Sequence, residues 1–411
     1  MSSSEKPRTG ARPFSSIRVV ECGAGISAAF ATKMLADLGA DVIKVEQPEG
    51  DWTRRRGPFP NDEPHPEKSA LFAYLNINKR GVVADLSRAE GREMLARLLE
   101  RADILIHNVA PAERESHGLE SAVLCAAYPR LIVTSISMFG DTGPRSRWRG
   151  YELNASNAGG WAYLSPGASP YRDLPPLKAF GHQCDFQSGV HAATVTLAAY
   201  RARAKSGRGQ AIDLSEQECI AAMLEMNFMH YTYAGRETSR LGQRGIGPWF
   251  IGDCADGKIF VICVEEDQWK RLVELMGNPE WAKDDLFKDR VSRAQNLDAL
   301  KALMSEWLAG WKVEDLFRKG QGEYRIPFAP CNTMRQIHEN GHLAERNFFV
   351  AFEQPGIGRI RLPGAPSKYG RTRWELGRPA PKLGEHSEEV LVGELGIARE
   401  RFASLRKAGL T

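Results

Sequence analysis

Short apolar runs alternate with segments of helical spacing over the first third of the chain. The β-branched run at 17–21 predicts a strand, and the apolar spacing of 28–38 predicts a helix that ends at Gly39. A second strand at 41–46 completes a strand, helix and strand unit with parallel strands and a right-handed crossover. The same alternation predicts strands at 81–86, 104–107 and 131–136 and helices at 87–101 and 118–127. We therefore predict an α/β fold with a doubly wound sheet.

The pattern changes beyond residue 144. A Gly-, Ser- and Pro-rich stretch leads into predicted helices at 188–204 and 213–233. From 256 to about 320, an apolar strand pair in KIFVICV and several amphipathic helices predict a separate small α+β domain. The predicted organisation is a disordered tail at 1–13, a large domain at 14–225 and 327–411, and linkers with the small domain at 226–326.

Charge and cysteine content narrow the class of protein. The 55 basic residues nearly balance the 51 acidic residues, so the formal net charge of +4 over 411 residues excludes a broad nucleic-acid-binding face. The seven cysteines include no CxxC pair, which favours reduced thiols over disulfides or a zinc site. No run approaches the roughly 18 apolar residues of a membrane span. We therefore expect a cytoplasmic protein with no membrane, nucleic acid or metal partner.

A glycine-rich turn follows the first predicted strand. Gly23 to Ala28 fits G-x-G-x-x-A, opens the first predicted helix, and is followed about 20 residues later by Glu46 at the end of the second strand. In a dinucleotide site such glycines let backbone amides approach a pyrophosphate, and the acid binds a ribose hydroxyl. These residues leave three interpretations open: an NAD site, a tight turn that packs a helix on its strand, and a site for another adenine nucleotide such as coenzyme A.

Six blocks in order along the chain carry a family resemblance. They are LADLGADVIKVE (35–46), NINKRGVVADL (76–86), YPRLIVTSISMFGDTGP (128–144), SGRGQAIDLSEQE (206–218), RIPFAPCNT (325–333) and RPAPKLGEHSEEVL (378–391). Together they resemble the class III coenzyme A transferases of the CaiB/BaiF type, which include formyl-CoA and carnitine CoA transferases and racemase relatives. The resemblance covers about residues 15 to 400.

The resemblance implies an architecture and an activity. It implies a Rossmann-like large domain built from both ends of the chain, a small α+β domain, and an interlocked, ring-like homodimer. It implies transfer of CoA from an acyl-CoA to an organic carboxylic acid, with CoA thioesters as substrates and no permanently bound cofactor. The family's nucleophile is an Asp four residues before a Gly, which matches Asp185 and Gly189 here.

A carboxylate at position 185 suits this chemistry, because it forms first an acyl anhydride and then a CoA thioester, which divides one hard exchange into easier steps. Position alone favours a simpler role for Asp185 as the N-cap of a following helix. Cys184 is an alternative nucleophile, but the expected chemistry needs no thiolate. His182, Cys184 and His191 have a spacing that matches no common metal site.

The resemblance also assigns contacts to CoA, which are expected near the ends of the first strands, and the polar, Pro- and Arg-rich stretch at 47–68 is predicted to be a functional loop. The assigned residues are Ile26, Ser27, Gln47, Arg54, Lys79, Arg80, Asn108 and Arg114. Several positions depart from the family pattern: Ile26 and Ser27 stand in its Q/L-A-G-P turn, Gln47 replaces a common basic residue, and Ser116 replaces an Arg. Arg54, Arg55 and Arg56 are candidates to compensate for these losses.

A glycine-containing segment at 240–249 takes the position of the family's lid. Gly245 and Gly247 are the predicted hinges, and Trp249 is predicted to exclude water from the reactive thioester. The alternative for this segment is an ordinary interdomain linker. The Met- and Tyr-rich set at 223–233 is interpreted as core more readily than as an acyl pocket.

Two other activities stay open. The racemase relatives place a His in a G-H-D segment, whereas this chain has Gly150-Tyr151-Glu152, and Tyr with an ordinary pKa of about 10 is a poor base near neutral pH. This difference favours a transferase over an acyl-CoA racemase or lyase. An NAD-dependent dehydrogenase is the more distant alternative.

Overall fold

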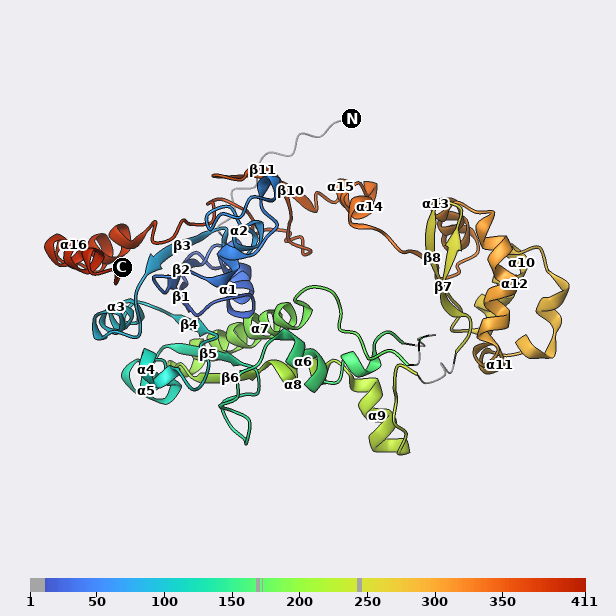
Figure 1. Cartoon of the computed structure of the whole chain (residues 1–411), viewed down its shortest axis with the longest axis horizontal. Helices are drawn as coiled ribbons and strands as arrows, with labels where there is room; N and C mark the ends of the chain where they lie inside the picture. The colour runs from blue at the N-terminus through green and yellow to red at the C-terminus, as the bar shows by residue number, and fades with distance from the viewer. Residues whose placement is uncertain (1–11, 168–170, 172, 242–245) are drawn as a thin grey trace. The chain divides into compact units, whose positions relative to one another are not determined.

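The computed structural model describes residues 12–167, 171, 173–241 and 246–411 (Figure 1). The chain forms two compact units. The first contains the chain up to Ser165 together with Pro176–Glu237 and Phe348–Thr411, so both ends of the chain build it; the second contains Pro166–Pro175 and Thr238–Asn347. Residues 1–11 of the predicted tail lie outside the described residues, while Arg12 pairs with Glu375 at 3.0 Å.

The centre of the first unit is a six-stranded parallel sheet with the order β3-β2-β1-β4-β5-β6 (Figure 1). Its strands are β1 (Arg18–Cys22), β2 (Asp41–Glu46), β3 (Lys79–Val83), β4 (Ile104–His107), β5 (Ile132–Ser137) and β6 (Ala211–Ser215). This confirms the predicted α/β class. The order reverses between β1 and β4, and the carboxyl ends of strands at such a reversal form the usual ligand crevice.

Helices cover both faces of this sheet. Its helices are α1 (Ser27–Asp37), α2 (Ala70–Asn76), α3 (Ala89–Leu99), α4 (Arg114–His117), α5 (Ser121–Ala127), α6 (Glu152–Ala158), α7 (Gln183–Ser206), α8 (Glu216–Ala222), α9 (Glu225–Ala234) and α16 (Arg399–Lys407). One core joins the sheet to α3, α5 and α16, and the other joins it to α1 and α7. Val19 and Val20 are both fully buried, one on each face, so neighbouring apolar residues of β1 pack into different cores. A hairpin of β10 (Phe349–Gln354) and β11 (Gly358–Pro363) completes the unit.

Two predicted elements of this unit differ from the structure. The helix predicted at 213–233 is instead β6 followed by α8 and α9, because Ala211 pairs with Val133 along β5 and Ser215 caps a new helix. The strand predicted at 81–86 begins earlier, at Lys79. Apolar spacing over a short run does not separate a buried strand from a helix, which accounts for the first error.

The second unit has its own sheet and core. Its elements are β7 (Trp249–Cys254), β8 (Gly257–Ile262), β9 (Ala329–Pro330), α10 (Glu266–Leu275), α11 (Arg290–Gln295), α12 (Leu297–Ala309), α13 (Val313–Phe317), α14 (Met334–His338) and α15 (Gly341–Glu345). The predicted strand pair in KIFVICV is therefore the single strand β8, whose hairpin partner β7 precedes it. Pro330 pairs with Ile259 and Phe328 is buried in this core, which places 327–347 in the second unit.

None of the helices in the described part of the chain combines the length and apolar content that a bilayer crossing requires.

Candidate active site

The glycine-rich turn links β1 to α1 and needs its glycines. Gly23 and Gly25 have φ values of 108° and 96°, in the region that favours glycine. A Cβ on Gly23 would lie 2.0 Å from Oδ1 of Asn108, and one on Gly25 would lie 2.8 Å from Nε1 of Trp52. The turn therefore packs closely against β4 and against the loop after β2.

Two backbone amides of this turn already have side-chain partners within the chain. The N–H of Ala24 donates to Oδ1 of Asn108 at 3.1 Å, and Nδ2 of Asn108 donates back to the carbonyl of Ala24 at 2.7 Å. The N–H of Gly25 donates to both carboxylate oxygens of Asp51, at 3.0 and 3.1 Å. A pyrophosphate at this turn would compete with a buried carboxylate for the Gly25 amide.

Glu46, the acid predicted to bind a ribose hydroxyl, also has a partner within the chain. Glu46 accepts from Nε and Nη2 of Arg54, at 2.8 and 2.7 Å, in a bidentate pair. Both side chains are buried, and Arg54 also pairs with Glu67 at 2.8 Å. These contacts, together with those of the turn, argue against the NAD site and show that Arg54 holds the loop after β2 in place.

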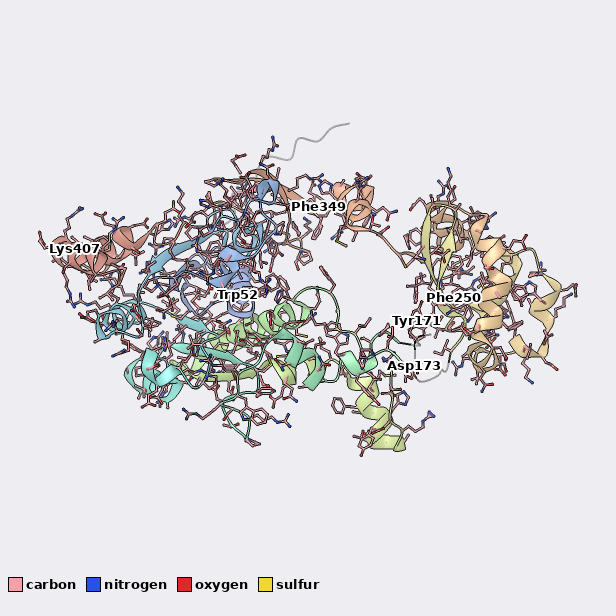
Figure 2. The ribbon with its side chains drawn as sticks, viewed as in Figure 1. Trp52, Tyr171, Asp173, Phe250, Phe349 and Lys407 are labelled. Atoms are coloured by element: carbon pink, nitrogen blue, oxygen red, sulfur yellow. The ribbon has the colours of Figure 1, made fainter. Side chains whose placement is uncertain are left out.

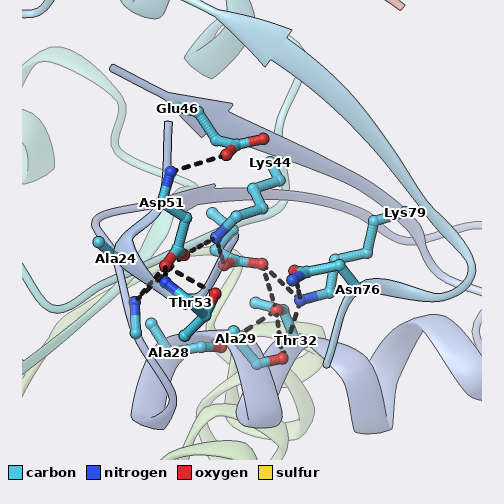
Figure 3. Close-up of polar contacts among 12 residues, drawn as sticks. Ala24, Ala28, Ala29, Thr32, Lys44, Glu46, Asp51, Thr53, Asn76 and Lys79 are labelled. Carbon is cyan, nitrogen blue, oxygen red and sulfur yellow. Dashed lines mark hydrogen bonds and ion pairs between the residues drawn. The ribbon is translucent and has the colours of Figure 1, made fainter. Parts of the chain in front are cut away.

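A buried ion network beneath the turn holds Asp51 (Figure 3). Lys44 bridges Glu21 and Asp51 at 2.7 and 2.9 Å, and Lys79 pairs with Glu21 at 2.8 Å. Burial by itself would raise the pKa of Glu21, but the two ammonium groups outweigh it and lower the pKa to about 2. Nζ of Lys79 also donates to Asn76, so this predicted CoA ligand is buried inside the network.

Two further predicted CoA ligands have carboxylate partners. Arg80 donates to both oxygens of Asp41, at 2.9 and 2.7 Å, and pairs with Glu389 at 2.9 Å. Arg114 pairs with Asp141. Their charges are balanced within the sheet unit, so each has a structural role here, and binding of phosphate by Arg80 or Arg114 stays a prediction.

His107, at the end of β4, is buried beside Arg114. In the described part of the chain neither of its ring nitrogens has a hydrogen-bond partner. Burial, and secondarily the charge of Arg114, lower the pKa of His107 to about 3 from its ordinary 6.5. The imidazole is therefore neutral in the folded protein at neutral pH.

This burial predicts a pH dependence of stability. The unfolded chain takes up a proton at His107 below about pH 6.5 and the folded chain does not, so the contribution to stability falls as pH decreases from 6.5 toward 3. Between pH 7.5 and pH 5 the wild type should lose about 2 kcal/mol more unfolding free energy than His107→Leu, measured by urea denaturation. Equal losses in the two proteins would contradict the prediction.

A cavity of about 790 Å³ opens at the carboxyl ends of the parallel strands, next to the reversal of strand order. Four of the predicted CoA contacts line it: Ile26, Ser27, Gln47 and Asn108. The loop after β2 contributes Trp52, which is labelled in Figure 2, and the cation of Arg56. The helix-start residues Glu152, Asp185 and Glu216 line the same cavity.

Asp185 stands in the first turn of α7. His182 is the N-cap residue of this helix, so the interpretation of Asp185 as the cap is wrong. Nδ1 of His182 lies 2.9 Å from Oδ2 of Asp185, and the imidazole packs against the Trp52 ring at 5.9 Å between centroids. The Asp185 side chain is 15% exposed, and the helix dipole favours its negative charge.

Gly189 explains why α7 starts beside the glycine-rich turn. A Cβ at this position would lie 2.8 Å from the carbonyl oxygen of Ser27 at the start of α1. Only glycine lets the first turns of α1 and α7 approach this closely, and the approach places Asp185 in the same cavity as Ser27.

Two more acids surround Asp185, and Glu216 was missed by sequence reasoning. Glu152 begins α6 and pairs with Lys178 at 2.7 Å. Glu216 begins α8, and burial, with the charge of Asp185 adding to it, raises the pKa of Glu216 to about 8. The available signal was an acid directly after AIDLS (211–215), part of which was predicted as helix and which the structure shows to be a strand whose end adjoins the crevice.

Cys184 is not a competing nucleophile. Its side chain is buried, and burial, reinforced by Glu152, raises the pKa of the thiol to about 12. Since the thiolate is the reactive form, a thiol with this pKa is unreactive at neutral pH.

The predicted lid falls in the second unit. Gly245 lies outside the described residues. Gly247 is buried: its N–H donates to the carbonyl of Arg290 at 2.9 Å, and its carbonyl accepts from Nε of Arg293 at 2.9 Å. Trp249 begins β7. The lid role of these residues stays a prediction.

Comparisons with known proteins agree with this fold. Residues 14–387 match CoA-transferase family III. The chain is 32% identical to the succinate–glutarate CoA-transferase of Agrobacterium fabrum, over 92% of this chain and 95% of that protein. It is 31% identical to the formyl-CoA:oxalate CoA-transferase of Streptomyces coelicolor, over 97% and 99%. A solved CaiB/BaiF family protein from Brucella suis superposes with a TM-score of 0.81 at 31% identity, over 94% of this chain and all of that one.

The fold is a parallel α/β sheet whose crevice holds a carboxyl group at the start of a helix. Proteins of one class match the chain over nearly its whole length, and this match defines it as a transferase of CoA groups. The chain belongs to CoA-transferase family III.

Proposed function

We propose that this protein moves CoA from an acyl-CoA donor to an organic carboxylic acid, with Asp185 as the nucleophile. The observation that carries the proposal is the position of Asp185: a partly exposed carboxylate in a cavity of about 790 Å³, held by His182 at the start of a helix. The Agrobacterium and Streptomyces relatives are named for succinate, glutarate, formyl-CoA and oxalate. Small organic acids of this kind are the proposed substrates.

The proposed chemistry uses one carboxylate twice. Asp185 attacks the thioester carbonyl, the C–S bond breaks, and CoA leaves as a thiolate from a mixed anhydride. The thiolate attacks the Asp185 carbonyl of that anhydride and releases the donor's acid, which leaves an aspartyl-CoA thioester. The carboxylate of the second acid displaces the thiolate to form a second anhydride. Attack of the thiolate on the new acyl carbon yields the product thioester and restores Asp185.

The residue at position 151 disfavours the alternative activities of an acyl-CoA racemase or lyase. In the cavity the position of the racemase His is taken by Tyr151, the N-cap of α6, whose side chain is 77% exposed. Tyr151 supplies a phenol hydroxyl where the racemases have an imidazole base. Transfer between two acids needs no such base, because carboxylates are the attacking groups.

We also propose a homodimer of interlocked subunits in the cytoplasm, with the lid segment excluding water from the aspartyl thioester. Large apolar side chains support a partner surface, since Phe180 is 99% and Tyr233 86% exposed on the single chain. The seven cysteines are all free, as expected of a protein in a reducing compartment.

The test is chemical trapping of Asp185. The purified protein is incubated with formyl-, acetyl-, succinyl-, glutaryl- and oxalyl-CoA in turn, treated with hydroxylamine, digested, and mapped by mass spectrometry. We expect a hydroxamate on the peptide that contains Asp185 with at least one thioester, because hydroxylamine cleaves both the anhydride and the thioester at this carbonyl. Absence of the modification with every thioester, or its appearance on another residue, would reject Asp185 as the nucleophile.

A further inference from the structure

Glu216 points a buried carboxyl group into the cavity of Asp185. It is the first residue of α8, directly after β6, and it is only 7% exposed. The hydroxyl of Ser215 accepts from the N–H of Glu218 at 3.2 Å, which fixes the start of the helix. Glu216 therefore has a defined position in the cavity wall, and the roles assigned to Asp185 do not use it.

The groups that face Glu216 are acids or neutral groups. Asp185 on α7 and Glu152 on α6 both act on it with negative charge, which raises its pKa, and the hydroxyl of Ser27 on α1 lies near it and lowers its pKa. Cys219, on the next turn of α8, is a thiol whose pKa is raised to about 11, first by burial. Within the described part of the chain no cation pairs with Glu216, whereas Glu152 and Asp185 have Lys178 and His182 as partners.

A buried carboxyl without a cation, next to another carboxylate, is most stable with its proton. Burial and the charge of Asp185 raise the pKa of Glu216 to about 8, whereas the more exposed Asp185 has Nδ1 of His182 at 2.9 Å from its Oδ2. At neutral pH Glu216 is therefore a carboxylic acid, and a carboxylic acid donates a hydrogen bond where a carboxylate only accepts.

We propose that Glu216 binds the carboxylate of the acid substrate as a neutral hydrogen-bond donor. The inference rests on the proposed function, in which an anionic acid must enter a cavity that already holds the carboxylates of Asp185 and Glu152. A neutral donor in that wall offsets the repulsion without neutralising the nucleophile. The exchange consumes one carboxylate and releases another, so Glu216 keeps its proton throughout.

The first experiment measures the proton and needs no turnover. Infrared difference spectra of the wild type are recorded from pH 6 to pH 10 and compared with those of Glu216→Gln and of the control Glu218→Gln, an exposed acid on the same helix. We expect a protonated-carboxyl C=O band at pH 7 that disappears with a midpoint near pH 8, is missing in Glu216→Gln and persists in Glu218→Gln. A wild type without this band at pH 7, or a band that persists in Glu216→Gln, would overturn the proposal.

The second experiment adds acetate, which is small enough to enter any pocket built for a carboxylate, and then succinate. A ligand that binds the protonated form raises the midpoint of titration. We therefore expect the band to move to lower frequency and its midpoint to rise, and we expect wild-type affinity to fall about tenfold between pH 7 and pH 9. Glu216→Gln, which keeps a donor, should bind equally at both pH values, and Glu216→Leu should bind weakly at both.

If neither acetate nor succinate shifts the band or its midpoint, the proton of Glu216 serves only its contact with Ser27, and binding of the acid substrate by Glu216 is rejected. Because these spectra are recorded without a thioester, a failed trapping of Asp185 and a failed response of Glu216 are separate results.

Discussion

Asp185→Asn is expected to lower the rate of CoA transfer by at least about 10³-fold, because the amide keeps the size and hydrogen-bonding position of the side chain but is not a nucleophile. The variant preserves the contact of position 185 with His182 and the first turn of α7. The measurement is the initial rate of transfer between the acyl-CoA and acid that give the fastest turnover in the wild type. Binding of the acyl-CoA should survive, since the cavity walls are unchanged.

The control for this result is Glu218→Gln, which also exchanges an acid for its amide near the site but on the exposed face of α8. It should retain wild-type rates. If Asp185→Asn retained more than a tenth of the wild-type rate while its circular dichroism matched that of the wild type, covalent catalysis by Asp185 would be ruled out.

Lys44→Met is expected to lower the free energy of unfolding of the sheet unit by about 3–5 kcal/mol, because removal of one member leaves buried carboxylates without compensation. Lys44 bridges Glu21 and Asp51, both almost completely inaccessible to solvent. The measurement is urea-induced unfolding at pH 7. At this pH the contribution of Glu21 is fully present, since its lowered pKa means that stability is lost only as pH falls below 4.5 toward 2.

A matched control is Lys283→Met, which removes an exposed lysine from a pair with Glu280 and should leave the unfolding curve nearly unchanged. The double variant Lys44→Met/Asp51→Asn should recover part of the loss, because it removes one of the uncompensated charges. A loss in Lys44→Met no larger than that in Lys283→Met would mean that the network contributes little to stability.

The strands were the part of the fold that local sequence predicted best. The strand at 41–46 and the strand at 104–107 have the predicted bounds, because the aliphatic residues of both are buried on the two faces of the sheet. The predicted helix at 213–233 failed because β6 passes directly into α8 at Ser215, without the glycine or proline that marks most such changes. The choice between strand and helix here depends on pairing with β5, and the local spacing of apolar residues does not show that pairing.

The arginines predicted to bind CoA show a second limit of prediction from sequence. Arg80 was predicted to bind CoA because its motif matches the family, yet it pairs with Asp41 and with Glu389, about 300 residues further along the chain. Likewise Arg54 forms ion pairs with Glu46 and Glu67. A positive charge in a motif indicates that an anion lies nearby, but whether that anion is a carboxylate of the same chain depends on the folded arrangement.

The sequence by itself determined the class of fold, the family and the position of the acid at 185, because apolar runs, glycine spacings and ordered motifs are properties of the linear chain. Only the tertiary structure decided that Glu216 lies beside Asp185 and that the amide of Gly25 is bonded to Asp51. The physical reason is that protonation and hydrogen bonding depend on burial and on neighbours brought together by α1, α7 and α8, which the order of residues does not specify.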